Sequence, residues 1–215
     1  LAKVLVHYSM SLKPGDLFQL RTHPAAQDLT LAVFEEAVKA GAHTFIQTTV
    51  SGAEELYFKY ASDAQLDFVN PARHLFAEKY DASLTIWAED NTRHLAGINP
   101  ERLARASKAA ADLNKLFLER AARGEMRWCL TAYPNNAMAQ EADMSLADYT
   151  EFVFAAGMLN DADPVAFWKA EGERQKKIED WMRGKDKVIL KGSSIDLKMS
   201  VKDRVFVRCD GKLNF

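Results

Sequence analysis

The chain has 215 residues, of which 28 are basic and 30 acidic, so its formal net charge is −2 at neutral pH. The charges are spread along the chain without a basic stripe, which excludes the electrostatic signature of a nucleic-acid-binding protein. No stretch reaches the roughly 18 apolar residues of a membrane span, and 48% hydrophobic residues are typical of a globular protein.

The first 50 residues alternate between helical and strand patterns. Apolar side chains at helical spacing between Leu1 and Tyr8 predict an opening helix. A Pro-Gly turn at 13–16 then leads into a strand at 17–21. The next helix presents Leu31, Phe34 and Val38 and ends at Gly41, and His43–Val50 follows as a second strand. Helix and strands together have the length of a βαβ crossover.

The alternation continues to residue 133. Ser51 and Glu54 have the spacing of a capping box and predict a helix through Tyr60, and another helix is expected over 71–79. A third strand is expected over 83–88, one long helix from Asn99–Pro100 to Phe117, and a fourth strand over 126–133. This order predicts an α/β fold with a mostly parallel sheet covered by helices on both faces.

The pattern changes after Pro134. Helices are expected from Ser145 and from Asp163–Pro164, the second ending at Gly184. The first should turn Leu146, Tyr149, Phe152, Val153 and Ala156 inward. Short strands should follow at 188–190, 195–201 and 205–207, with a hairpin loop at 192–194. We therefore expect an N-terminal α/β domain with a helical extension at 1–185 and a β-rich connecting segment at 186–215.

No complete active site is visible in the sequence. The five histidines (His7, His23, His43, His74 and His94) are scattered, and HExxH, phosphate-loop and nucleophile-elbow motifs are absent. Glu89, Asp90 and His94 follow the third strand and form the best local metal candidate, because ligands bind at the carboxyl ends of strands in open α/β sheets. A solvated polar loop is the favoured interpretation of this segment. We therefore assign no catalytic and no metal-binding residue.

Other conspicuous side chains are expected to be structural. His43 should pack or hydrogen-bond at the start of its strand, and the adjacent carboxylates Glu35–Glu36 and Glu54–Glu55 should lie on helix surfaces. The four tryptophans lie within apolar patterns and are predicted to be core residues: Trp87, Trp128, Trp168 and Trp181. Cys129 is predicted to be a buried, reduced thiol. Two cysteines and no signal-peptide pattern favour a cytoplasmic location.

Several short blocks, read together, resemble one protein family. They include the turn at 13–16 with 37–42, then Trp128, Tyr133–Pro134, Ala139–Ala142, Met144–Leu146, Tyr149, Phe152–Val153, Asp163–Val165 with Trp168, and 195–197. This order is similar to the aminopeptidase T and aminopeptidase S family, the thermophilic metalloproteases, over essentially the whole chain. Asn135 departs from the pattern, in which a Thr is expected.

The resemblance implies a metal-dependent aminopeptidase that releases N-terminal amino acids from peptides. Its metals would be zinc, cobalt, manganese or magnesium, and its partners the peptide substrate and a second copy in a homodimer. In this family the metal ligands lie in a C-terminal domain that begins with a Pro-Asp-Gly-Glu-like segment. The sequence stops at Phe215, where that segment is expected. The chain is thus expected to be the non-catalytic N-terminal portion, with no metal bound.

Two other interpretations remain open. The chain could be a stand-alone α/β module that binds a ligand or a protein without catalysis. It could also be a small enzyme that uses the Glu89, Asp90 and His94 neighbourhood.

Overall fold

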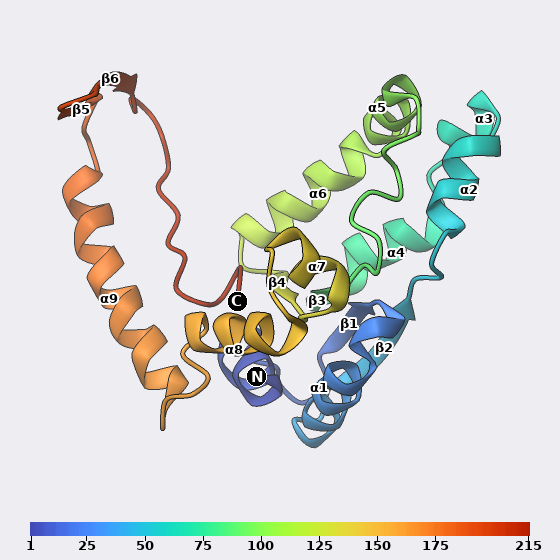
Figure 1. The fold of residues 1–215 in the computed structure, drawn as a ribbon, viewed down its shortest axis with the longest axis horizontal. Coiled ribbons are helices and arrows are strands. Elements are labelled where there is room, and N and C mark those ends of the chain that lie inside the picture. Colours follow the sequence, from blue (N-terminus) through green and yellow to red (C-terminus); the bar gives the residue numbers. More distant parts are fainter.

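The computed structural model describes residues 1–215 and shows a parallel sheet with a separate β-hairpin (Figure 1). Strands β1 (Leu17–Thr22), β2 (His43–Thr48), β3 (Ala82–Trp87) and β4 (Arg127–Ala132) pair in the order β2-β1-β3-β4, all parallel. Strands β5 (Lys187–Gly192) and β6 (Ile195–Ser200) form an antiparallel pair. The predicted α/β fold class is confirmed.

Helices connect the strands and form the C-terminal region. They are η1 (Val4–Ser9, a π-helical turn), η2 (Pro24–Ala26), α1 (Gln27–Lys39), α2 (Ala53–Tyr60), α3 (Asp63–Leu66), α4 (Pro71–Lys79), α5 (Pro100–Ala109), α6 (Ala111–Ala122), α7 (Asn136–Glu141), α8 (Leu146–Ala156) and α9 (Pro164–Met182). Gly41 follows α1 with φ +83°, as the sequence predicts for a left-handed helix end.

The hydrophobic core lies on one face of the sheet. Phe18 and Leu20 on β1 are fully buried, and so are Leu5 on η1, Met10 directly after it and Val33 on α1. Every second strand residue reaches this core because successive side chains of a strand point to opposite faces. Each large apolar side chain contributes about 1.5–3 kcal/mol by leaving water, so this face holds the sheet in place.

The opposite face of the sheet is polar on its two central strands, β1 and β3. It presents Gln19 and Arg21 from β1, next to Ser83 and Thr85 of β3 in the parallel register. Helices α4 and α6 pack against each other on this side. Parallel sheets usually bury two apolar faces, so a polar face beneath helices is the unusual feature of this fold.

The single long helix expected from Pro100 to Phe117 is wrong. Two helices, α5 and α6, meet at Ala110, whose φ −86° and ψ 3° are not helical. Ala110 and Leu113 are both buried, and the break lets α5 pack on α3 while α6 packs on α4. The spacing of the apolar residues predicts the buried side of both helices, but it does not indicate the break between them.

The C-terminal region is more exposed than the sequence predicts. Helix α9 and strands β5 and β6 extend from the sheet as an arm, and the chain then returns to it (Figure 1). Helix α8 has no buried residue, and Phe152, expected to face inward, is 61% exposed. Trp87 and Trp181 are 49% and 67% exposed, so their assignment to the core is also wrong. Burial of these side chains would need a further structural element to cover them, and residues 1–215 do not provide one.

The expected strand at 205–207 is absent, and residues 213–215 lie beside β4 instead. The Leu130 amide donates to Leu213 O at 2.9 Å and the Phe215 amide to Leu130 O at 3.0 Å. The preceding residues bind the N-terminal helix, because Tyr8 Oη donates to Asp210 O and Ser9 Oγ to Gly211 O. The return segment, residues 201–215, is thus held at residues 210–215 and is not paired as a strand at 205–207.

Two local predictions also fail. Ser51 and Glu54 form no capping box: α2 begins after Gly52, which has φ +80° and offers no capping side chain. The reciprocal bonds of a capping box occur at Ser62 and Gln65 on α3. His43 is exposed and only its backbone is bonded, to Asp16 O at 2.8 Å, since β2 is an edge strand of the sheet.

Candidate functional site: a polar pocket on the sheet

The residues after β3 occupy the carboxyl edge of the sheet, but they do not converge on one point. His94 Nε2 lies 3.2 Å from Glu54 Oε2, and its Nδ1 lies 2.9 Å from Asn91 O. Asp90 instead accepts a hydrogen bond from Ser51 Oγ at 3.0 Å and lies 3.9 Å from His23 Nε2. Asp90 and His94 therefore bind different partners.

Glu89 lies apart from both and has an unusual environment. Its backbone carbonyl accepts from Asn135 Nδ2 at 3.0 Å, while its carboxylate atom Oε2 is buried and makes no hydrogen bond. Asn135 also caps α7 by accepting from the Met138 amide at 3.0 Å. The residue that departs from the family pattern thus joins the end of β3 to the start of α7.

The partners of His94 favour its charged form. Burial by itself would lower the pKa of His94, but the hydrogen bonds to Asn91 O and Glu54, with the negative charges of Glu54 and Glu89, raise it overall. Metal binding needs the neutral ring, so protonation of His94 would compete with it.

No group of three or more His, Cys, Asp or Glu side chains within residues 1–215 is arranged to hold a metal ion. The remaining histidines do not change this, because His7 pairs with Glu36 at 3.0 Å, His23 contacts Ser51 at 3.1 Å, and His43 and His74 are exposed. The divalent metals implied by the resemblance therefore find no ligand set in these residues. We derive no metal-dependent step from them.

A pocket of about 830 Å³ lies on the polar face of the sheet, between the strands and helices α4 and α6. Two rows of side chains form its floor. They are Gln19, Ser83 and Trp128 in the first row, and Gln47, Arg21, Thr85 and Leu130 in the second. The volume is in the range of small-molecule sites.

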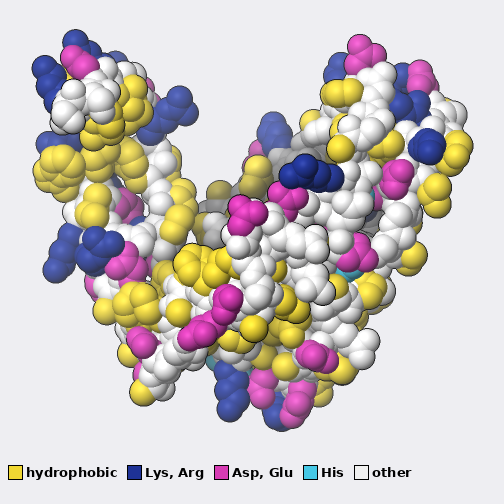
Figure 2. Space-filling model, in the orientation of Figure 1, with side chains coloured by type: hydrophobic (Ala, Val, Ile, Leu, Met, Phe, Trp, Pro, Cys, Tyr) yellow, Lys and Arg dark blue, Asp and Glu magenta, His cyan; other side chains and the backbone are white.

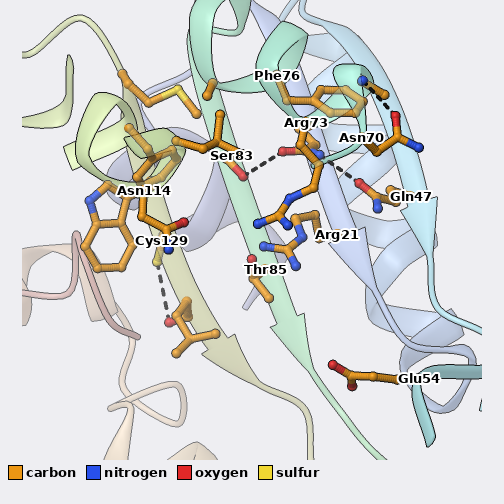
Figure 3. Close-up of a pocket in the computed structure, with 18 residues that line it drawn as sticks. Arg21, Gln47, Glu54, Asn70, Arg73, Phe76, Ser83, Thr85, Asn114 and Cys129 are labelled. Carbon is orange, nitrogen blue, oxygen red and sulfur yellow. Dashed lines mark hydrogen bonds between the residues drawn. The ribbon is translucent and has the colours of Figure 1, made fainter. Parts of the chain in front are cut away.

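A directed chain of hydrogen bonds crosses the pocket floor (Figure 3). Ser83 Oγ donates to Gln19 Oε1 at 3.2 Å, and Gln19 Nε2 donates to Gln47 Oε1 at 2.8 Å. Both oxygens are used in this chain, whereas the Gln47 amide nitrogen has no partner among residues 1–215. The chain therefore ends on a free donor.

Two arginines enter the same pocket from different elements. Arg21 rises from β1 and Arg73 extends from the first turn of α4, and Figure 3 shows both side chains directed to the same region. Both side chains are exposed to solvent. The pKa of Arg21 is nevertheless lowered, first by burial among protein atoms and then by the charge of Arg73, while Glu89 acts in the opposite direction. Glu54 also lines the pocket, but it is paired with His94.

The other side chains singled out in the sequence have structural environments. Cys129 is a free buried thiol in the hydrophobic core, and burial raises its pKa to about 12. Glu35 and Glu36 share Lys39 at 2.6 and 3.3 Å on the surface of α1. A buried thiol with a raised pKa is unreactive, so Cys129 has no nucleophilic role.

Sequence reasoning missed Arg21, Arg73 and Gln47. The available signal was the alternation of polar residues at Gln19 and Arg21 in one strand and at Ser83 and Thr85 in the next. Such alternation indicates a sheet with a polar face rather than one buried on both sides.

Comparisons with known proteins cover most of the chain. The family model described as thermophilic metalloprotease (M29) matches residues 1–214. Aminopeptidase 2 of Geobacillus stearothermophilus is 24% identical over 195 residues, which cover 86% of this chain and 47% of that protein. The chain therefore spans about half the length of this relative.

The structure of wild-type AmpT from Thermus thermophilus is similar with a TM-score of 0.72 and 21% identity. The match covers 93% of this chain and 52% of that one, and it shows a common fold. No helix in residues 1–215 combines the length and apolar character needed to cross a membrane. With a family model that matches almost every residue, this chain belongs to the thermophilic metalloprotease (M29) family.

Proposed function

We propose that this chain is the N-terminal, non-catalytic portion of a metal-dependent aminopeptidase that releases N-terminal amino acids from peptides. One observation carries the proposal: the family model matches residues 1–214, yet these residues contain no group of three side chains arranged for a metal ion. The similar aminopeptidase of Geobacillus stearothermophilus supports the activity, and its length, about twice the matched segment, supports a division of the enzyme into two halves.

In this proposal the divalent metals (zinc, cobalt, manganese or magnesium) bind in the other half of the enzyme. Residues 1–185 form the α/β domain with its helical extension, and 186–215 connect it to the catalytic half. The β5–β6 hairpin supports a connecting role for this segment, because one face of the hairpin is apolar and largely exposed. The side chains on that face are Val188, Leu190, Ile195, Leu197 and Met199. Figure 2 shows hydrophobic side chains gathered over the arm. Large exposed apolar patches mark surfaces that another structure covers.

The proposal includes a cytoplasmic location and a homodimer. Both cysteines are free, which suits a reducing compartment. The exposed apolar side chains of α8 and α9, such as Phe152 and Trp181, would suit contact with a second copy or with the other half.

The test compares the 215-residue chain with the full-length gene product, both purified without added metal. Metal content by mass spectrometry and hydrolysis of leucine-p-nitroanilide are measured for each, before and after adding zinc, cobalt, manganese or magnesium. We expect metal and activity in the full-length protein alone. His94→Ala in the full-length protein is the matched control and should leave both unchanged.

Hydrolysis by the 215-residue chain would overturn the division into two halves. Loss of hydrolysis in the full-length His94→Ala variant would place the site after β3. A full-length protein that neither binds metal nor hydrolyses the substrate would overturn the aminopeptidase assignment.

A further inference from the structure

We propose that the pocket on the polar face of the sheet binds a small organic anion, whose carboxylate or phosphate group lies between the guanidinium groups of Arg21 and Arg73. The proposal concerns a site in the α/β domain itself. It stands independently of the proposed peptidase activity.

The first argument is that these two arginines have no protein partner. Every other arginine except Arg204 donates to a carboxylate or a backbone carbonyl, namely Arg93, Arg102, Arg105, Arg120, Arg123, Arg127, Arg174, Arg183 and Arg208. The side chains of Arg21 and Arg73 make no hydrogen bond and no ion pair within the protein, and both line the same pocket. Guanidinium groups recognise carboxylate and phosphate by paired, parallel hydrogen bonds.

The second argument is electrostatic. Two like charges face each other at a place where burial and the neighbouring charge already lower the pKa of Arg21. The nearest carboxylates do not neutralise them, because neither Glu54 nor Glu89 is within ion-pair distance of either guanidinium and Glu54 is bound to His94. An anion between the two groups would replace their repulsion by two attractions.

The remaining donors around the arginines point to the same class of ligand. The free Gln47 amide nitrogen ends the hydrogen-bond chain next to Arg21 in the sheet register. The first turn of α4, capped by Asn70 and carrying Arg73, lines the pocket as well. A helix N-terminus carries partial positive charge and favours anions. Thus three different elements, β1, β2 and α4, supply positive charge or free donors to one space.

The walls of the pocket indicate that the anion has an organic body. Phe76 and Phe117 lie beside the floor and Trp128 is part of it, and Phe117 and Trp128 pack with ring centroids 6.4 Å apart. A free inorganic ion would use only the arginine end of an 830 Å³ space. An apolar or aromatic group attached to the anion would fill the rest, in the manner usual for small-molecule sites.

The proposal is tested by calorimetric titration of the full-length protein at low ionic strength with two probes, sodium benzoate and inorganic phosphate. Arg21→Gln and Arg73→Gln should each weaken binding at least tenfold. Arg204→Gln, which removes the other unpartnered arginine outside the pocket, is the matched control and should bind like the wild type. Arg73→Lys, which keeps the charge but not the paired geometry, should be intermediate.

The outcomes separate the two chemical sources. Tighter binding of benzoate assigns a carboxylate with an aromatic or apolar body, whereas tighter binding of phosphate assigns a phosphate ester. A wild type that binds neither probe, or variants at Arg21 and Arg73 that bind as well as the Arg204 variant, would overturn the proposal. Melting temperatures in anion-free buffer verify folding, and Arg73→Gln should melt no lower than the wild type because it relieves repulsion.

Discussion

Replacing Gly211 by alanine should detach the return segment from the N-terminal helix. Gly211 has φ +79°, in the left-handed region that disfavours a side chain. A Cβ added there would lie 3.2 Å from Trp168 Cδ2 and 3.3 Å from Phe215 Cδ2. Neither ring can move freely, because Trp168 Nε1 donates to Gly157 O at 3.0 Å and the two rings pack at 5.6 Å.

The expected cost has two parts. The left-handed backbone costs an alanine about 1–2 kcal/mol, and forcing a methyl group into a packed contact adds about 1–3 kcal/mol. Gly184 separates the two parts, because it has φ +75° but no atom within 4 Å of an added Cβ. Gly184→Ala should therefore lose only the backbone part, and Gly211→Ala about 2–5 kcal/mol in total.

Urea denaturation followed by tryptophan fluorescence would give the free energy of unfolding of both variants. Hydrogen exchange at the Leu130 and Phe215 amides would show whether the loss is local to the return segment, since these amides hold it beside β4. If Gly211→Ala lost no more stability than Gly184→Ala, the contact with Trp168 would not constrain this turn and the reasoning would be refuted.

Three further predictions concern the edge of the sheet and the thiols. Asn135→Ala should lower the free energy of unfolding by about 1–3 kcal/mol, because it removes the cap of α7 and the bond to Glu89 O; Asn135→Asp, which keeps the capping acceptor, should lose less in the same denaturation assay. The pairing of His94 with Glu54 should stabilise the fold fully below the usual histidine pKa of about 6.5 and be lost as pH rises through the raised pKa of His94. Glu54→Gln should lower that pKa in an NMR titration, and an unchanged pKa would contradict the assignment of Glu54 as a partner. In the 215-residue chain, Ellman's reagent should modify only Cys209 in the native state and both thiols after unfolding, because Cys129 is buried with a pKa raised to about 12; rapid native modification of Cys129 would show that it is not enclosed.

Local patterns predicted most of the sheet. The strand at 17–21, the helix ending at Gly41 and the following strand agree closely with β1, α1 and β2, because glycine punctuation and apolar periodicity are properties of short segments. The break at Ala110 was not predictable, since it has neither proline nor glycine and follows from the different partners of α5 and α6.

The pocket was harder to predict because it depends on relations between distant segments. The alternation at Gln19 and Arg21 shows that one strand face is polar. It does not show that Arg73, on a helix more than 50 residues later, shares the same space. The prediction that Trp181 is a core residue failed for a related reason. An apolar pattern indicates that a side chain is to be covered, but it does not indicate which element covers it.

The bonds between the N-terminal helix and the return segment have a consequence for synthesis of the protein. Tyr8 and its acceptor Asp210 are 202 residues apart. At roughly 5–20 residues per second, about 10–40 s pass between the translation of one and that of the other. During that interval the Tyr8 and Ser9 hydroxyls lack their native acceptors, so this end of the core is completed late. Pausing of the ribosome within the arm would prolong the exposure, and the nascent chain would then depend most on chaperones.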